Sequence, residues 1–284
     1  MARLLKGAEV AAALNERTAA RAAALRERGV VPTLGIVRVG ERPDDLSYER
    51  GAVKRAESLG VAAERFTLSA DATQSDLLDL IYRINANDRI HGVLLFRPLP
   101  KHLDEDEICN TLAPEKDIDG ITDLSGAGVF AGKALGYAPC TPTACLEILD
   151  HYGIDCTGKK VTVVGRSLVV GRPAAMLLLG RNATVTVCHT RTCDLAATCR
   201  EADILVAAAG RIGMIGAEAV RPGQIVLDVG VNWDPVAGKL RGDVDFEAVE
   251  PIVEAITPVP GGVGTVTTSV LVGRAVEAAE KQSG

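Results

Sequence analysis

The chain has 284 residues, enough for one large or two modest domains, each with a buried core. Its composition, 47% hydrophobic and 24% charged, argues against disorder. A formal net charge of -6 without a basic block makes nucleic acid a poor partner. The sequence has neither a signal-peptide pattern nor the roughly 20 apolar residues of a membrane span, so we expect a cytoplasmic protein.

Metal binding and disulfides are not expected. The seven cysteines are odd in number and form no CxxC pair, and the four histidines lack metal-ligand spacing. Only 3% of the residues are aromatic, so the core must consist mainly of Ala, Val, Leu and Ile. That composition favours parallel strands covered by helices on both faces.

In the first half of the chain, helical and strand-like segments alternate. Apolar spacing and terminal glycines predict helices at 10–28, 47–59 and 75–86. Short apolar runs predict strands at 34–39 and 92–96. The Gly- and Asp-rich segment 114–136 is predicted to be a loop.

The second half repeats the alternation. Strands are predicted at 161–164, 184–188, 204–208 and 225–229. Helices are predicted at 143–152, 171–180 and 267–281, the last after a loop at 258–264. We therefore predict an α/β protein whose two halves pack closely, with a cleft between them.

A glycine turn follows the predicted strand 161–164. Gly165 and Gly171 flank it, and a helix follows, as in sites where the backbone approaches a pyrophosphate at a helix N-terminus. The spacing is G-x5-G rather than G-x-G-x-x-G, so a tight turn without a ligand is the alternative.

The next predicted strand, 184–188, indicates which dinucleotide would bind. NAD-specific Rossmann folds usually carry Asp or Glu after this strand, whereas here His189, Thr190 and Arg191 follow it. Thr190 and Arg191 can donate to a 2′-phosphate, and Arg166 adds a further guanidinium. Each arginine alone could be a solvated surface charge, but together they favour NADP.

Several motifs together resemble the methylenetetrahydrofolate dehydrogenase/cyclohydrolase family, called FolD in bacteria. They are Gly165-Arg-Ser-x-x-Val-Gly171-x-Pro173, Asp228-Val-Gly-x-Asn232, Gly242-Asp-Val244, Ile256-Thr-Pro-Val-Pro-Gly-Gly-Val-Gly264, Lys116-Asp-Ile-Asp-Gly120 and Pro139-Cys-Thr-Pro142. The resemblance covers nearly the whole chain.

The resemblance implies a folate-binding catalytic domain at 1–138 with 268–284, and a Rossmann NADP-binding domain at 139–267. It implies tetrahydrofolate derivatives as substrates, a homodimer, and a role in one-carbon metabolism and purine biosynthesis. The cofactor-binding residues are Gly165, Arg166, Ser167, Gly171 and Gly230 from the motifs of the resemblance, together with Thr190 and Arg191 from the strand that follows the glycine turn.

Two catalytic residues and a substrate-binding loop follow from the same resemblance. Asp119 matches the family's folate-binding aspartate, although an Asx-turn role beside Gly120 is the alternative. Tyr48 matches the active-site tyrosine that stacks on and orients the folate ring. Pro260, Gly261 and Gly262 match a loop whose backbone approaches the ligands closely.

Two positions depart from the family pattern. Ala52, four residues after Tyr48, stands where the family has its acid/base lysine, and Phe96 stands where it has a glutamine. Lys54 should face away and Arg55 cannot easily release a proton, whereas Arg97, beside Phe96, remains an alternative electrostatic partner in the site.

The missing lysine should affect the two family reactions unequally. Hydride transfer mainly needs alignment, whereas hydrolysis of the methenyl ring needs proton transfer. We therefore expect a dehydrogenase with weak or absent cyclohydrolase activity. The alternatives are a fully bifunctional enzyme with a substitute for the lysine, a non-catalytic folate- or NADP-binding protein, and a shikimate-type NADP dehydrogenase.

Overall fold

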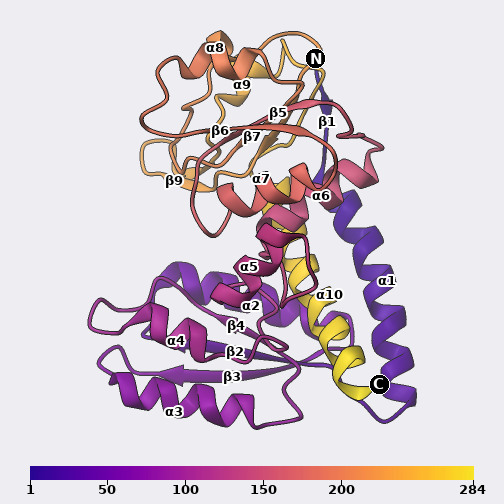
Figure 1. Cartoon of the computed structure of the whole chain (residues 1–284), viewed down its shortest axis with the longest axis vertical. Helices are drawn as coiled ribbons and strands as arrows, with labels where there is room; N and C mark the ends of the chain where they lie inside the picture. The colour runs from indigo at the N-terminus through magenta and orange to yellow at the C-terminus, as the bar shows by residue number, and fades with distance from the viewer. The chain divides into compact units, whose positions relative to one another are not determined.

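The computed structural model describes residues 1–284, which form two compact units (Figure 1). The six-stranded unit comprises Met1–Ala12 and Thr141–Thr267, and the three-stranded unit comprises Ala13–Cys140 and Thr268–Gly284. Two long helices, α1 (Gly7–Glu27) and α10 (Val263–Ser283), each begin in the six-stranded unit and end in the other. No helix combines the length and apolar character needed to span a bilayer.

The three-stranded unit is built on a small parallel sheet. Its central strand is β2 (Thr33–Val39), which pairs with β3 (Ala62–Leu68) and β4 (Gly92–Leu95). The helices that complete its chain order are α2 (Pro43–Ser58), α3 (Gln74–Asn85), α4 (Glu105–Thr111) and α5 (Asp123–Ala131).

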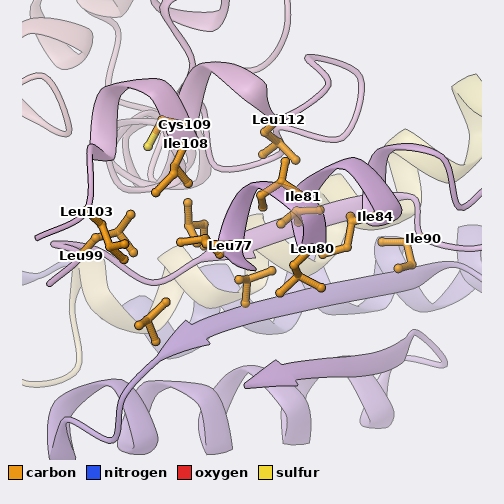
Figure 2. Packing of buried hydrophobic residues seen from close by; sticks show 14 residues of the cluster. Leu77, Leu80, Ile81, Ile84, Ile90, Leu99, Leu103, Ile108, Cys109 and Leu112 are labelled. Atoms are coloured by element: carbon orange, nitrogen blue, oxygen red, sulfur yellow. The ribbon is translucent and has the colours of Figure 1, made fainter. Parts of the chain in front are cut away.

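Helix α3 shows why this unit folds as it does. Thr73 caps it in a capping box with Asp76, which satisfies two backbone N–H groups of the first turn. Leu77 and Ile81 lie on its buried face, and Ile108 of α4 joins the same apolar cluster (Figure 2). Each such buried side chain contributes about 1.5–3 kcal/mol of transfer free energy.

The six-stranded unit contains one parallel sheet in the order β1-β11-β8-β7-β5-β6. Its strands are β1 (Arg3–Leu4), β5 (Lys160–Val164), β6 (Thr184–Cys188), β7 (Ile204–Ala207), β8 (Ile225–Asp228) and β11 (Ala255–Ile256). Its other elements are α6 (Cys140–His151), α7 (Gly171–Leu179), α8 (Leu195–Arg200), the 3₁₀ turn η1 (Ala217–Ala219), α9 (Phe246–Val249) and the hairpin β9 (Asn232–Asp234) with β10 (Lys239–Arg241).

Strand β5 lies at the topological switch point of this sheet. The next strand along the chain, β6, pairs on one side of β5, whereas β7 pairs on the other. Ligands of open α/β sheets bind outside the carboxyl ends of the strands at such a point. Gly165 is the first residue after β5, so the predicted phosphate turn occupies this position.

The α/β alternation predicted in both halves is confirmed, with differences at several elements. The predicted loop 114–136 contains helix α5, because Thr122 caps it and Gly132 ends it in the left-handed conformation. Helix α2 begins at Pro43 rather than 47, and α10 begins at Val263 rather than 267. Strand β3 was not predicted, because its half-exposed sequence contains Glu64 and Arg65.

The N-terminal segment belongs to the larger sheet. Arg3 pairs with Ala255 and Leu4 with Ile256, so β1 extends the six-stranded sheet beyond β11. The domain bounds taken from the family resemblance group residues 1–12 with the folate half instead. A two-residue strand has no sequence pattern of its own, so only its pairing reveals this placement.

Candidate functional site

Tyr48 lies in the first half of helix α2. Its side chain is 36% exposed, and its ring meets the edge of Phe96, with centroids 5.9 Å apart and planes at 84°. Burial of the hydroxyl raises the pKa of Tyr48, and the nearby charge of Asp119 raises it further, whereas a hydrogen bond with Thr268 opposes the shift. Tyr48 is therefore a neutral hydrogen-bonding group with an accessible ring.

Helix α2 is continuous from Pro43 to Ser58, so Ala52 lies one turn beyond Tyr48 on the same face. Ala52 is completely buried. Lys54 is exposed, in agreement with the prediction that it faces away, and Arg55 is half-buried. None of these side chains supplies a cation at position 52 itself.

Asp119 lies in the loop between Lys116 and helix α5. Burial raises the pKa of the Asp119 carboxyl, while hydrogen bonding by the thiol and the backbone of Cys140 and the charge of Arg97 lower it. The electrostatic coupling of Asp119 with Tyr48 places these two predicted residues in one neighbourhood of the three-stranded unit.

Neighbouring residues of the same loop have structural roles. Asp117 accepts hydrogen bonds from the backbone of Ile121 and Thr122 and from the hydroxyl of Ser125, at 2.6–2.9 Å. The Lys116 ammonium donates to three backbone carbonyls at 2.8–2.9 Å. These contacts fix the loop that presents Asp119.

The glycine turn of the six-stranded unit is built for close backbone packing. Gly165 has φ +125°, and a Cβ there would lie 2.1 Å from the carbonyl oxygen of Ala208. A Cβ on Gly171 would lie 2.2 Å from the carbonyl oxygen of Gly165. The turn therefore requires glycine at both positions, and it leads directly into the N-terminus of α7.

Ser167 has a local role in this turn. Its hydroxyl oxygen accepts from the backbone N–H groups of Val170 at 3.1 Å and Gly171 at 3.4 Å. Arg166, Thr190 and Arg191 are exposed and hence accessible to a ligand.

Two buried carboxylates accept hydrogen bonds from the backbone of the loops around this turn. Neither of them was predicted from the sequence to be a site residue. Asp243 accepts from the backbone of Ala209, Gly210 and Arg211 at 2.6–2.8 Å. Asp228 accepts from the backbone of Gly230 at 3.0 Å, which fixes another predicted cofactor residue. Both carboxylates lie in motifs of the family resemblance, which is the only sequence signal for them.

Pro260, Gly261 and Gly262 lie in the six-stranded unit, whereas Tyr48 and Asp119 lie in the three-stranded unit. The carbonyl oxygen of Gly261 accepts from the backbone N–H of Gly7 at 2.8 Å, at the start of α1. This hydrogen bond fixes the loop within its own unit.

Two neighbours of the Tyr48–Asp119 pair were missed as site residues. Cys140 contacts Asp119, and Thr268 contacts Tyr48. Cys140 lies in the quoted Pro139-Cys-Thr-Pro142 motif, which could have indicated it, whereas nothing in the sequence marks Thr268. No group of three or more His, Cys, Asp or Glu side chains is arranged to hold a metal ion.

Comparisons with known proteins agree with both units. Residues 5–119 match the family model "Tetrahydrofolate dehydrogenase/cyclohydrolase, catalytic domain", and residues 139–283 match the corresponding NAD(P)-binding domain. The chain is 54% identical to a "Bifunctional protein FolD" of Carboxydothermus hydrogenoformans, covering 100% of this chain and 99% of the relative.

Solved structures give the same result. A bifunctional FolD of Campylobacter jejuni has a TM-score of 0.96 at 37% identity, covering 99% of both chains. The Trypanosoma brucei FolD, solved with NADP and an inhibitor, has a TM-score of 0.94 at 34% identity, covering 99% of this chain and 98% of that one. Matches over both domains at this identity show that the chain belongs to the tetrahydrofolate dehydrogenase/cyclohydrolase family.

Proposed function

We propose that this protein oxidises 5,10-methylenetetrahydrofolate to 5,10-methenyltetrahydrofolate with NADP and also opens the methenyl ring by hydrolysis. The observation that carries the proposal is the full-length likeness to a relative named bifunctional, with both family domains present. The grouping of Tyr48 and Asp119 in the catalytic domain supports it.

The three-stranded unit would hold the folate. The Asp119 carboxylate can accept hydrogen bonds from neighbouring N–H groups of the pterin edge. The accessible Tyr48 ring can stack on the substrate, and the edge contact with Phe96 restricts its orientation. Because hydride transfer depends mainly on alignment, these two side chains supply what the first reaction needs.

The six-stranded unit fits NADP. The turn that Gly165 and Gly171 allow leads directly into the N-terminus of α7, whose free N–H groups and helix dipole suit a pyrophosphate. Arg166, Thr190 and Arg191 would bind the 2′-phosphate, and Ser167 would shape the turn by capping. When bound, NADP accepts the hydride.

The expectation of weak or absent hydrolysis finds no support in the comparisons, since the relative from Carboxydothermus hydrogenoformans is named bifunctional. We therefore infer that ring opening proceeds although Ala52 carries no proton-transferring group. Tyr48 retains its proton because burial raises its pKa, so its hydroxyl can orient a water near the reacting carbon.

Separate assays of the two steps test this proposal. With purified protein, NADPH formation from methylenetetrahydrofolate reports the dehydrogenase, and loss of methenyltetrahydrofolate absorbance reports the hydrolase. We expect both rates to exceed the uncatalysed background, and NADP to be preferred over NAD. Accumulation of the methenyl compound without hydrolysis would restrict the function to the dehydrogenase, and cofactor binding without NADPH formation would exclude catalysis.

A matched pair of variants tests the cofactor assignment. Arg191→Ala should raise the KM for NADP by about 10-fold or more and leave that for NAD nearly unchanged, since a charged phosphate contact is lost. Lys159→Ala, at another exposed cation of the same unit, should change neither. We also propose a homodimer, from the family resemblance, and light scattering should then give about twice the 29.7 kDa of the chain.

A further inference from the structure

The carboxylate of Asp243 joins the loops that follow two central strands of the six-stranded sheet. It is completely buried. Its Oδ2 accepts from the backbone N–H groups of Ala209 and Gly210 at 2.6 and 2.8 Å, and its Oδ1 accepts from that of Arg211 at 2.8 Å. Oδ1 also accepts from the side-chain amide of Asn232 at 2.9 Å. One carboxylate therefore fixes the loop after β7 to the segment after β8.

The surrounding backbone is shaped to hold this carboxylate. A Cβ on Gly230 would lie 2.2 Å from Oδ1 of Asp243, although the φ of Gly230 is outside the left-handed region that favours glycine. Asp228, the last residue of β8, holds both residues, because its Oδ1 accepts from the backbone N–H of Asp243 at 2.9 Å and of Gly230 at 3.0 Å. Gly230 is therefore glycine because the Asp243 carboxylate occupies the space of its side chain.

The loop that Asp243 holds also borders the glycine turn. The carbonyl oxygen of Ala208 lies 2.1 Å from the place of a Cβ on Gly165, so the loop after β7 packs directly on the turn after β5. A dinucleotide binds across the switch point with one half on each side. Arg191 follows β6 on one side of β5, whereas β7 and β8 lie on the other. With the 2′-phosphate at Arg191, the nicotinamide half lies against the loops that Asp243 joins.

We propose that Asp243 is a positioning residue for the nicotinamide half of NADP, because it sets the spacing of the loops after β7 and β8. It acts through these loops and does not touch the cofactor, since both of its oxygens are buried and accept from the protein. Hydride transfer depends on the alignment of the nicotinamide, so displaced loops should reduce kcat as well as affinity. This inference rests on the proposed NADP-dependent function and adds a residue to it.

Binding of two ligands separates positioning from general disruption: NADP and adenosine 2′,5′-bisphosphate, which lacks the nicotinamide half. In Asp243→Asn, an amide nitrogen replaces an oxygen that accepts from two donors, so two hydrogen bonds are lost. NADP binding and kcat should each fall by about 10-fold, and binding of the bisphosphate by less than about 2-fold. Arg191→Ala should instead weaken both ligands. Glu247→Gln, at an exposed carboxylate of the same unit, is the matched control and should behave as wild type.

Hydrogen exchange provides a readout that needs no ligand. The amides of Ala209, Gly210 and Arg211 lose their acceptor in Asp243→Asn and should exchange about 10-fold faster or more, while the amides of β5 stay protected. Asn232→Ala is a milder variant that removes a single donor to Asp243. It should weaken NADP binding by about 2- to 5-fold with the same sparing of the bisphosphate.

Equal weakening of NADP and the bisphosphate in both Asp243→Asn and Asn232→Ala would overturn the proposal, and so would unchanged exchange of the three amides. Thermal unfolding checks that each variant is folded. If the wild type forms no NADPH but Asp243→Asn still weakens NADP selectively, the proposed function fails and this inference stands. If turnover is normal and folded Asp243→Asn binds both ligands as wild type does, only this inference fails.

Discussion

Two neighbouring sets of buried charge in the three-stranded unit differ in how their hydrogen-bonding capacity is used. Lys116 and Asp117 bond only to other groups of the protein: Lys116 donates three short hydrogen bonds and Asp117 accepts three. Asp119 has a different environment: burial raises the pKa of its carboxyl, and only hydrogen bonds from Cys140 and the charge of Arg97 oppose that shift. A buried charge satisfied by its own chain therefore indicates a structural role, and one left partly unsatisfied indicates a ligand.

Replacing Lys116 should have the largest effect on stability. Lys116→Met removes a charged donor from three backbone carbonyls, one in a buried and two in part-buried contacts, so the free energy of unfolding should fall by about 3 kcal/mol. Urea denaturation would measure the loss. Lys133→Met, at an exposed lysine of the same unit, should change stability by less than about 0.5 kcal/mol. Equal effects of the two variants would show that the buried contacts are not stabilising.

Asp117→Asn should destabilise the protein by about 2 kcal/mol. Its two oxygens accept from three donors, so an amide nitrogen in place of either oxygen must face at least one of them. The same denaturation experiment applies, with Asp79→Asn at an exposed carboxylate as the control. A loss no greater than that of the control would remove the distinction between the two sets of charge.

Asp119→Asn should show the opposite pattern. The pKa of Asp119 is raised in the folded protein, so folding favours the protonated carboxyl. The contribution of Asp119 to stability is therefore complete below its unfolded pKa and is lost as the pH rises through the folded pKa. At neutral pH the variant should therefore be as stable as wild type or slightly more stable. Tetrahydrofolate binding should nevertheless weaken by about 100-fold, since two charge-assisted hydrogen bonds are altered. Calorimetric titration measures binding, and denaturation of the same sample measures stability. A loss of stability without a loss of binding would show that Asp119 has a structural role like that of Asp117.

Gly51→Ala should have the smallest effect on the free energy of unfolding, and it serves as a reference for the other variants. Gly51 is exposed within helix α2, and a Cβ there would contact nothing within 4 Å. Alanine should raise the free energy of unfolding by about 0.5–1 kcal/mol and leave folate binding unchanged. A loss of binding would show that α2 itself must be flexible for Tyr48 to function.

Elements with strong local signals were predictable. Helix α3 combines a capping box with a regular apolar face, and β6 was predicted with its observed bounds because an alternating β-branched run forms it. Strand β3 lacked such signals, and helix α5 has capping residues at Thr122 and Gly132 but no regular apolar face. The first carries charged residues and lies at the edge of its sheet, and the second is glycine-containing and stabilised by Ser125, which bonds to Asp117.

The sequence by itself determined the α/β alternation, the glycine turn after β5 and, through its motifs, the family. These are local properties, because apolar period and glycine spacing act over a few residues. Only the tertiary structure decided which charges are satisfied. Asp117 and Asp119 are alike in sequence, but they point to different surroundings. Asp117 accepts from three donors in the segment that follows it, whereas Asp119 meets Cys140 and the charge of Arg97, which are distant along the chain and are brought near it only by the fold.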